Sequence, residues 1–229
     1  MFRTFLAVLA LSLSALAQTQ PTNSIQATGN ATISGIAPDR VQLTIGVVTS
    51  AKTAQDAASQ NAAQTNGVIT AIQQTIGANG SVQTIGYSLS PQYSGGTSTT
   101  PATITGYTAT NTVLVSVNGT ANLNLVGPVI DAANQAGANN ISGPSYGLQN
   151  ADPYQQQALT AAAKQALSHA AAIAAGLGGK AGAVISAQEG SYVTPVVGAL
   201  AAAGANSTPI QTGTVSVSAT VNVTVALSQ

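Results

Sequence analysis

The sequence predicts an α+β protein in which an antiparallel-rich sheet carries three helices on one face. Several segments alternate strictly between apolar and polar residues, which is typical of half-buried strands. Three longer segments carry apolar residues at helical spacing. Because the strands alternate and are not apolar throughout, only one face of the sheet is expected to be buried.

Two alternating segments open the folded part of the chain. Apolar side chains occupy every second position in residues 25–33 and again in residues 41–47. Pro38 and Asp39 between them predict a turn. We therefore expect these two strands to form a hairpin.

The first helix is predicted to begin at Thr53, because Thr53 and Asp56 fit an N-cap pair. Gly77 is expected to end it. The predicted apolar face of this helix consists of Ala58, Ala62, Thr65, Ile69, Ile72 and Ile76.

The middle of the chain predicts two long strands, a second helix and a short strand. Residues 82–93 and 104–117 alternate, and a loop rich in Gly, Ser, Thr and Pro joins them. The second helix spans residues 125–136, with Pro128 in its first turn, where a missing N–H costs least. Residues 141–148 contain a Gly-Pro pair and predict an edge or bulged strand.

The last third predicts a helix followed by two strands. Asp152 fits an N-cap and Pro153 the first helical position of an Ala-rich helix that runs to residue 177. Residues 183–188 predict a strand and residues 192–213 a long loop. Residues 215–227 alternate without interruption, so this strand is expected inside the sheet.

The predicted order places a split β-α-β-β-α-β arrangement over residues 41–148, followed by a C-terminal α-β-β extension. We expect residues 25–229 to form a single domain after a flexible leader at residues 18–24.

The N-terminus predicts a cleavable signal peptide at residues 1–17. Arg3 precedes an apolar stretch, and Ala15 and Ala17 fit the A-x-A cleavage rule, leaving Gln18 as the expected mature N-terminus. The apolar stretch is shorter than the roughly 20 residues that a membrane-spanning helix needs. The expected location is the periplasm or the outside of the cell, with association with the outer membrane left open and no transmembrane span in the mature chain.

Charge is scarce: only 4% of the residues are Asp, Glu, Lys or Arg, with five basic and five acidic side chains. This excludes nucleic-acid binding, which needs a basic surface. A net charge near zero gives little repulsion between copies and favours self-association, so a homo-oligomer is expected. The chain has no cysteine, which excludes disulfides and thiolate-bound metals.

Candidate catalytic groups are few. His169 is the only histidine, so it has no second imidazole or thiolate with which to hold a metal. Lys164 and Ser168 lie one helical turn apart, as many surface pairs do. The carboxylates are scattered along the chain: Asp39, Asp56, Asp131, Asp152 and Glu189. The sequence therefore predicts no catalytic residue, no cofactor site and no metal site.

A glycine-rich segment at residues 176–181 matches the dinucleotide pattern G-x-G-x-x-A. A dinucleotide loop follows a strand and opens a helix, whereas this segment closes a helix and leads into a strand. A helix C-cap is the better interpretation. The apolar stretch at residues 196–203 is interpreted as core or as a self-contact.

The chain resembles the SIMPL domain family over nearly all of the mature sequence. The resemblance is carried by Ala27-Thr28-Gly29 followed by Pro38-Asp39, by residues 45–54, by residues 83–93 and 104–111, by Asp131-Ala132-Ala133, by residues 137–139 and 141–143, and by residues 215–219. It implies a bacterial envelope protein, in the periplasm or at the outer membrane, linked to envelope or oxidative stress tolerance. It implies no catalytic residues, and some family members self-assemble.

The expected function is therefore that of an exported, non-enzymatic envelope protein that acts by binding or self-assembly. Two alternatives remain. One is a small-ligand-binding or enzymatic protein with an uncharged polar pocket. The other is a structural surface or adhesion module, which the Thr-rich strand faces favour.

Overall fold

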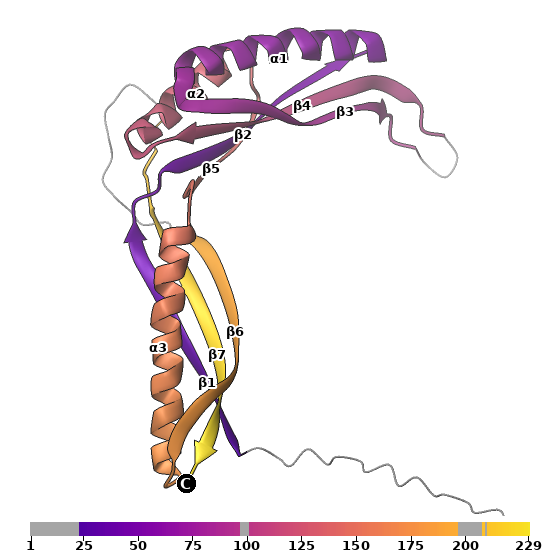
Figure 1. The fold of residues 1–229 in the computed structure, drawn as a ribbon. Helices are drawn as coiled ribbons and strands as arrows, with labels where there is room; N and C mark the ends of the chain where they lie inside the picture. Colours follow the sequence, from indigo (N-terminus) through magenta and orange to yellow (C-terminus); the bar gives the residue numbers. More distant parts are fainter. Residues whose placement is uncertain (1–22, 97–100, 197–207, 209) are drawn as a thin grey trace, which may run out of the picture.

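A computed structural model of the chain describes residues 23–96, 101–196, 208 and 210–229. Its strands and helices form an α+β fold, which confirms the predicted class (Figure 1). The strands are divided between two antiparallel sheets, in the orders β3-β4-β2-β5 and β1-β7-β6. The predicted signal peptide and most of the leader lie outside the described residues.

The split β-α-β-β-α-β arrangement is confirmed and builds what we call the four-stranded unit. Its elements are β2 (Arg40–Ala51), α1 (Ala54–Ile76), β3 (Gly80–Tyr93), β4 (Ile104–Asn118), α2 (Val126–Gln135) and β5 (Asn140–Gly147). Two short 3-10 helices join them, η1 (Gly77–Asn79) and η2 (Thr120–Leu125). β2 lies between β4 and β5, and its alternate side chains Val41, Leu43, Ile45 and Val47 are buried.

The core of the four-stranded unit lies between its sheet and the helices α1 and α2. Alternate residues of β2 and β4 point into it, as their period-two pattern predicts. The largest fully buried side chains include Leu43, Ile45, Ile72 and Val115. β5 is an edge strand with a bulge opposite β2 and a cis bond between Gly143 and Pro144, which agrees with its predicted edge position.

The remaining elements form the three-stranded unit. They are β1 (Ser24–Ile36), α3 (Asp152–Gly176), β6 (Lys180–Val196) and β7 (Thr214–Ser228). β7 pairs with β1 on one side and β6 on the other, which confirms its expected place inside a sheet. α3 covers one face of this sheet (Figure 1).

Two predictions about the strands are wrong. The strands do not share one sheet with all three helices on one face, and β1 and β2 do not form a hairpin. Alternation identifies a strand but not its partner, and both sides of β2 are taken by β4 and β5. β1 instead pairs with β7, from Ser24 opposite Ala226 to Ile36 opposite Val215.

α3 lies unusually close to its sheet because its buried side is made of alanine. The buried positions recur every four residues, at Ala158, Ala162, Ala166, Ala170 and Ala174. β1 contributes a glycine at the closest point: a Cβ on Gly29 would collide with the carbonyl of Ala162 and the backbone nitrogen of Ala166. Small residues on both elements therefore allow backbone-to-backbone contact.

The two units meet at one corner, where the chain crosses between them (Figure 1). Asp39 follows β1 and Gln149 follows β5, so each lies on a crossing segment. Asp39 accepts hydrogen bonds at its carboxylate from the Gln149 N–H and at its carbonyl from the Gly119 N–H. Thr208, between β6 and β7, donates from its hydroxyl to the Asp131 carboxylate of α2 at 2.6 Å. The corner is therefore fixed by several polar contacts.

Several predicted boundaries move. β6 is longer than residues 183–188, and its end at Val196 takes up the first part of the predicted loop at residues 192–213. The N-cap of α3 is Ala151 and not Asp152, which is the first helical residue. Pairing with β7 extends β6 beyond the residues that alternate between apolar and polar. This is a tertiary effect, so the local sequence pattern does not predict it.

Half of the predicted positions of the α1 face are shifted by one residue. Ala57, Asn61 and Val68 are buried in place of Ala58, Ala62 and Ile69, whereas Thr65, Ile72 and Ile76 are buried as predicted. The N-cap at Thr53 is confirmed, because its side chain accepts a hydrogen bond from the Asp56 N–H. The shift follows from the burial of Asn61. Because its side chain is polar, the spacing of apolar residues does not place it on the buried face.

Candidate functional site

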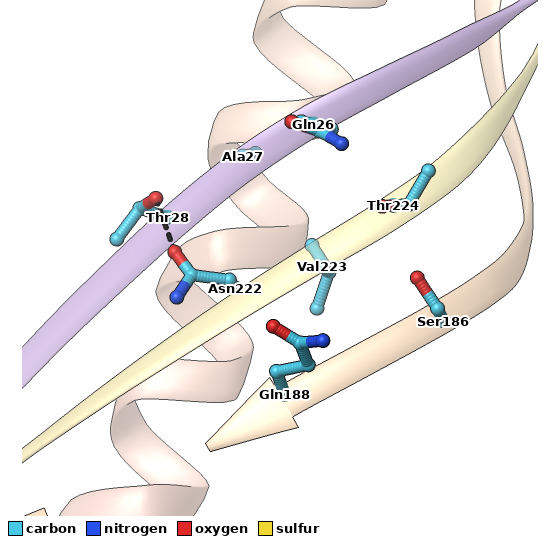
Figure 2. A pocket seen from close by; sticks show the side chains of 8 residues that line it. All are labelled: Gln26, Ala27, Thr28, Ser186, Gln188, Asn222, Val223 and Thr224. Atoms are coloured by element: carbon cyan, nitrogen blue, oxygen red, sulfur yellow. Dashed lines mark hydrogen bonds between the residues drawn. The ribbon is translucent and has the colours of Figure 1, made fainter. Parts of the chain in front are cut away.

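A groove of about 510 Å³ crosses the face of the three-stranded sheet that α3 leaves uncovered (Figure 2). Six polar side chains from three strands line it, and we call it the polar groove. They are Gln26 and Thr28 of β1, Asn222 and Thr224 of β7, and Ser186 and Gln188 of β6. Its size lies within the range of about 300–1,000 Å³ that is usual for small-molecule sites.

Strand register arranges these six side chains in two rows across the sheet. One row runs Thr28, Asn222, Gln188, and the other runs Gln26, Thr224, Ser186. Adjacent strands lie about 4.8 Å apart, and successive same-face residues lie about 6.7 Å apart along a strand. The groove therefore presents a regular two-row array of amide and hydroxyl groups, which we call the lattice of the groove.

Much of the hydrogen-bonding capacity of this lattice is unused. Thr28 donates from its hydroxyl to the Asn222 side-chain oxygen at 2.6 Å (Figure 2). Among the residues that the structure describes, the side chains of Gln26, Gln188 and Thr224 have no hydrogen-bond partner. Each amide offers two donor hydrogens and an acceptor oxygen, and each hydroxyl both donates and accepts.

The groove lining carries no ionisable group. Glu189 follows Gln188 on β6, but it lies opposite Val221, whose side chain is buried on the α3 side of the sheet. Its side chain therefore belongs to the opposite face from the groove. The groove is polar and electrically neutral.

His169, the single histidine, is exposed on α3 and bonded to the backbone. Its Nδ1 lies 2.8 Å from the carbonyl oxygen of Thr28, so the ring ties α3 to β1. Lys164 and Ser168 are exposed on the same helix, and neither side chain has a hydrogen-bond partner in the described parts of the chain. The structure does not bring these three groups together with a carboxylate.

Three of the carboxylates have separate partners. Asp39 binds Gln149 at the corner between the units, Asp56 binds Thr53 at the start of α1, and Asp131 binds Thr208. In the residues described, no group of three His, Asp or Glu side chains is placed to hold a metal ion. Asp56 therefore serves a helix start, whereas Asp39 and Asp131 hold segments that are distant in the chain.

The glycine-rich segment at residues 176–181 ends a helix, as the sequence predicts. Gly176 ends α3, Gly178 adopts a φ of +78°, and the Gly179 N–H donates to the Ala174 carbonyl at 2.9 Å. The chain then enters β6 at Lys180. A phosphate would meet carbonyl groups here and not the free N–H groups of a helix start.

A family model described as "SIMPL: Protein of unknown function (DUF541)" matches residues 25–225. The chain belongs to the SIMPL family. No curated protein matches it. The SIMPL match spans both units, from the second residue of β1 to near the end of β7.

The second notable surface of this SIMPL protein is the edge strand β3. Among the strands that the structure describes, its one partner is β4, and none of its 14 residues is charged. Large apolar side chains on β3 and the start of β4 are exposed by 39–61%, namely Ile85, Tyr87, Leu89, Tyr93 and Ile104. The apolar stretch at residues 196–203 lies almost entirely outside the described residues.

The sequence pattern of this SIMPL chain indicates neither surface as a site. In the sequence, the polar positions of the groove are only the solvent side of alternating strands. Their convergence depends on β1 pairing with β7, in which Thr28 and Asn222 are 194 positions apart in the chain. Only that long-range pairing places the two rows side by side.

No helix among the described residues has the length and hydropathy to cross a membrane.

Proposed function

We propose that this SIMPL protein is an exported, non-enzymatic protein of the bacterial envelope that acts by self-assembly through its exposed edge strand β3. The observation that carries the proposal is a long sheet edge with no charge and several exposed apolar side chains. Proteins that remain monomeric usually protect such edges with charges, bulges or covering elements.

The features of β3 favour pairing with another copy. In the described part of the chain, its outer backbone groups have no strand partner, because β4 lies on the other side. A bulge near Ile85 and the proline Pro91 interrupt the strand only locally. The low charge of the whole chain removes the electrostatic repulsion that would keep copies apart.

The test is the molar mass in solution, measured by size-exclusion chromatography with light scattering. We expect an oligomer for the natural protein and a smaller species for Tyr87→Lys, which places a charge on the edge strand. Leu167→Lys on the exposed side of α3 is the matched control and keeps the oligomer. A monomeric natural protein, or an unchanged mass for Tyr87→Lys, contradicts the proposal.

Export is tested separately by mass spectrometry of protein from the envelope fraction of a native-like host. A chain that begins at or near Gln18 supports export, and an intact Met1 contradicts it. The family resemblance supports a role in envelope or oxidative stress tolerance. Survival of a deletion strain under peroxide, with and without complementation, tests that role.

The non-enzymatic part of the proposal rests on the isolation of His169. A general acid or base needs a partner that holds it near a reacting group, whereas the Nδ1 of His169 is occupied by the Thr28 carbonyl. His169→Ala is therefore expected to complement the deletion strain. Loss of complementation by a folded His169→Ala protein would favour the enzymatic alternative.

A further inference from the structure

We infer that the polar groove of the three-stranded sheet binds an extended, neutral polysaccharide. The inference is independent of β3 and of self-assembly, because the groove lies on a different sheet (Figure 1, Figure 2). It rests on the composition of the lining, on its unused hydrogen-bonding groups and on the continuation of the polar rows along β1 and β7.

The absence of charge selects the ligand class. An anionic ligand such as a phosphate or a nucleic acid would need cationic partners, and the six lining side chains of the groove are all neutral. An apolar ligand would leave the amides of Gln26 and Gln188 without partners when it displaced water from them. A ligand dense in neutral hydroxyl groups satisfies both conditions.

The position of the groove excludes a peptide strand as the favoured ligand. Peptides are commonly bound by adding a strand at a sheet edge, where backbone groups are free. The centre of the groove lies over β7, whose backbone is already paired with β1 and β6. Recognition here must be by side chains, which suits the hydroxyl groups of a sugar.

The polar rows indicate an extended ligand. Beyond the groove, Thr220 donates from its hydroxyl to the Asn30 side-chain oxygen at 2.8 Å, and the hydroxyls of Thr32 and Ser218 lie 2.9 Å apart. From Gln26 to Thr32 the strand advances about 20 Å at roughly 3.3 Å per residue. On β6, Gly190 lies opposite Thr220 and adds no side chain to that row.

The test is isothermal titration calorimetry of the purified protein with three neutral hexasaccharides: chitohexaose, cellohexaose and maltohexaose. We expect at least one to bind with a Kd below about 1 mM. Binding is expected to be nearly independent of salt, because no counterions are released. A heparin hexasaccharide serves as the anionic comparison and is expected not to bind.

The double variant Gln26→Ala, Gln188→Ala removes one amide from each row, and we expect it to weaken binding by more than about tenfold. Gln73→Ala, Gln74→Ala on the exposed side of α1 is the matched control and is expected to bind normally. In the natural protein, the side-chain amide NMR signals of Gln26, Gln188 and Asn222 are expected to shift with the bound sugar.

Two results would overturn the inference. The first is no binding of any of the three neutral hexasaccharides, whether or not heparin binds. The second is binding that both double variants retain equally, with no shift of the groove amides. The oligomer test uses Tyr87→Lys on β3, whereas the sugar-binding test uses variants of the polar groove. Failure of one proposal can therefore be told apart from failure of the other.

Discussion

The carboxylate of Asp39 accepts a hydrogen bond from the backbone N–H of Gln149 at 2.6 Å, and the Gln149 side chain donates to the Asp39 carbonyl at 3.1 Å. The two residues are 110 positions apart in the chain. One lies where the chain leaves the three-stranded unit and the other where it returns. This reciprocal contact joins the two crossings at the corner between the units.

Replacing Asp39 with Ala is expected to lower the free energy of unfolding by about 1–3 kcal/mol, because a charge-assisted bond to a backbone N–H is lost. Asp39→Asn keeps one acceptor oxygen and is expected to lose less. Urea unfolding measures both. Asp152→Ala is the control, since its carboxylate has no hydrogen-bond partner in the described chain; an equal loss there would contradict the role of the Asp39 contact.

Gly29→Ala is expected to destabilise the three-stranded unit by about 1–3 kcal/mol. The new methyl group would meet the backbone of α3 at Ala162 and Ala166, which cannot move as a flexible side chain can. Thermal unfolding followed by circular dichroism measures the loss. Gly95→Ala, with open space around the site, is expected to leave the stability nearly unchanged.

Asn61→Ala is expected to cost about 2–3 kcal/mol. The buried Asn61 amide donates to the carbonyls of Val47 and Ala109 at 2.8 and 3.1 Å, so its loss removes the donor between α1 and two strands. Asn66→Ala on the exposed side of α1 is the control. Equal unfolding midpoints for the two variants would show that Asn61 does not anchor the helix.

Tyr146 is expected to make stability fall above about pH 10. Burial desolvates its phenol and raises the pKa above the usual value of 10.0. The unfolded chain then loses its phenolic proton at a lower pH than the folded protein, so the folded state binds more protons and stability falls with rising pH. The stabilising contribution of Tyr146 is complete at pH values below its pKa in the unfolded chain. It is lost as the pH rises through its pKa in the folded protein.

Tyr146→Phe tests this dependence through unfolding free energies measured across the alkaline range. The variant is expected to lose less stability at high pH. At neutral pH it is expected to be as stable as the natural protein or slightly more so, because the buried hydroxyl has no hydrogen-bond partner.

Local features of the fold could be predicted from the sequence, and pairings across the chain could not. The N-cap at Thr53 and the strand containing Val221 are visible because caps and period-two alternation involve neighbouring residues. The split between two sheets is not visible, because nothing near β1 specifies β7 as its partner. Alternation fixes which face of a strand is polar but does not say which other strands continue that face.

The residues of the polar groove could not be predicted for the same physical reason. Gln26, Gln188 and Asn222 are ordinary solvent-side residues in their own segments, and they become a lattice only through the register of three strands. The isolation of His169 was visible, because a single histidine without cysteine has few partners. Its bond to the Thr28 carbonyl was not, since it depends on where α3 lies over β1.

The pairing of β1 with β7 has a consequence for the order in which the protein acquires its structure. Residues 40–147 form the four-stranded sheet from one continuous piece of chain. The first strand, by contrast, must wait for the last one, because Ser24 pairs with Ala226. Contacts of such long sequence separation form slowly. During synthesis, β1 therefore stays without its partner until nearly the whole chain has emerged.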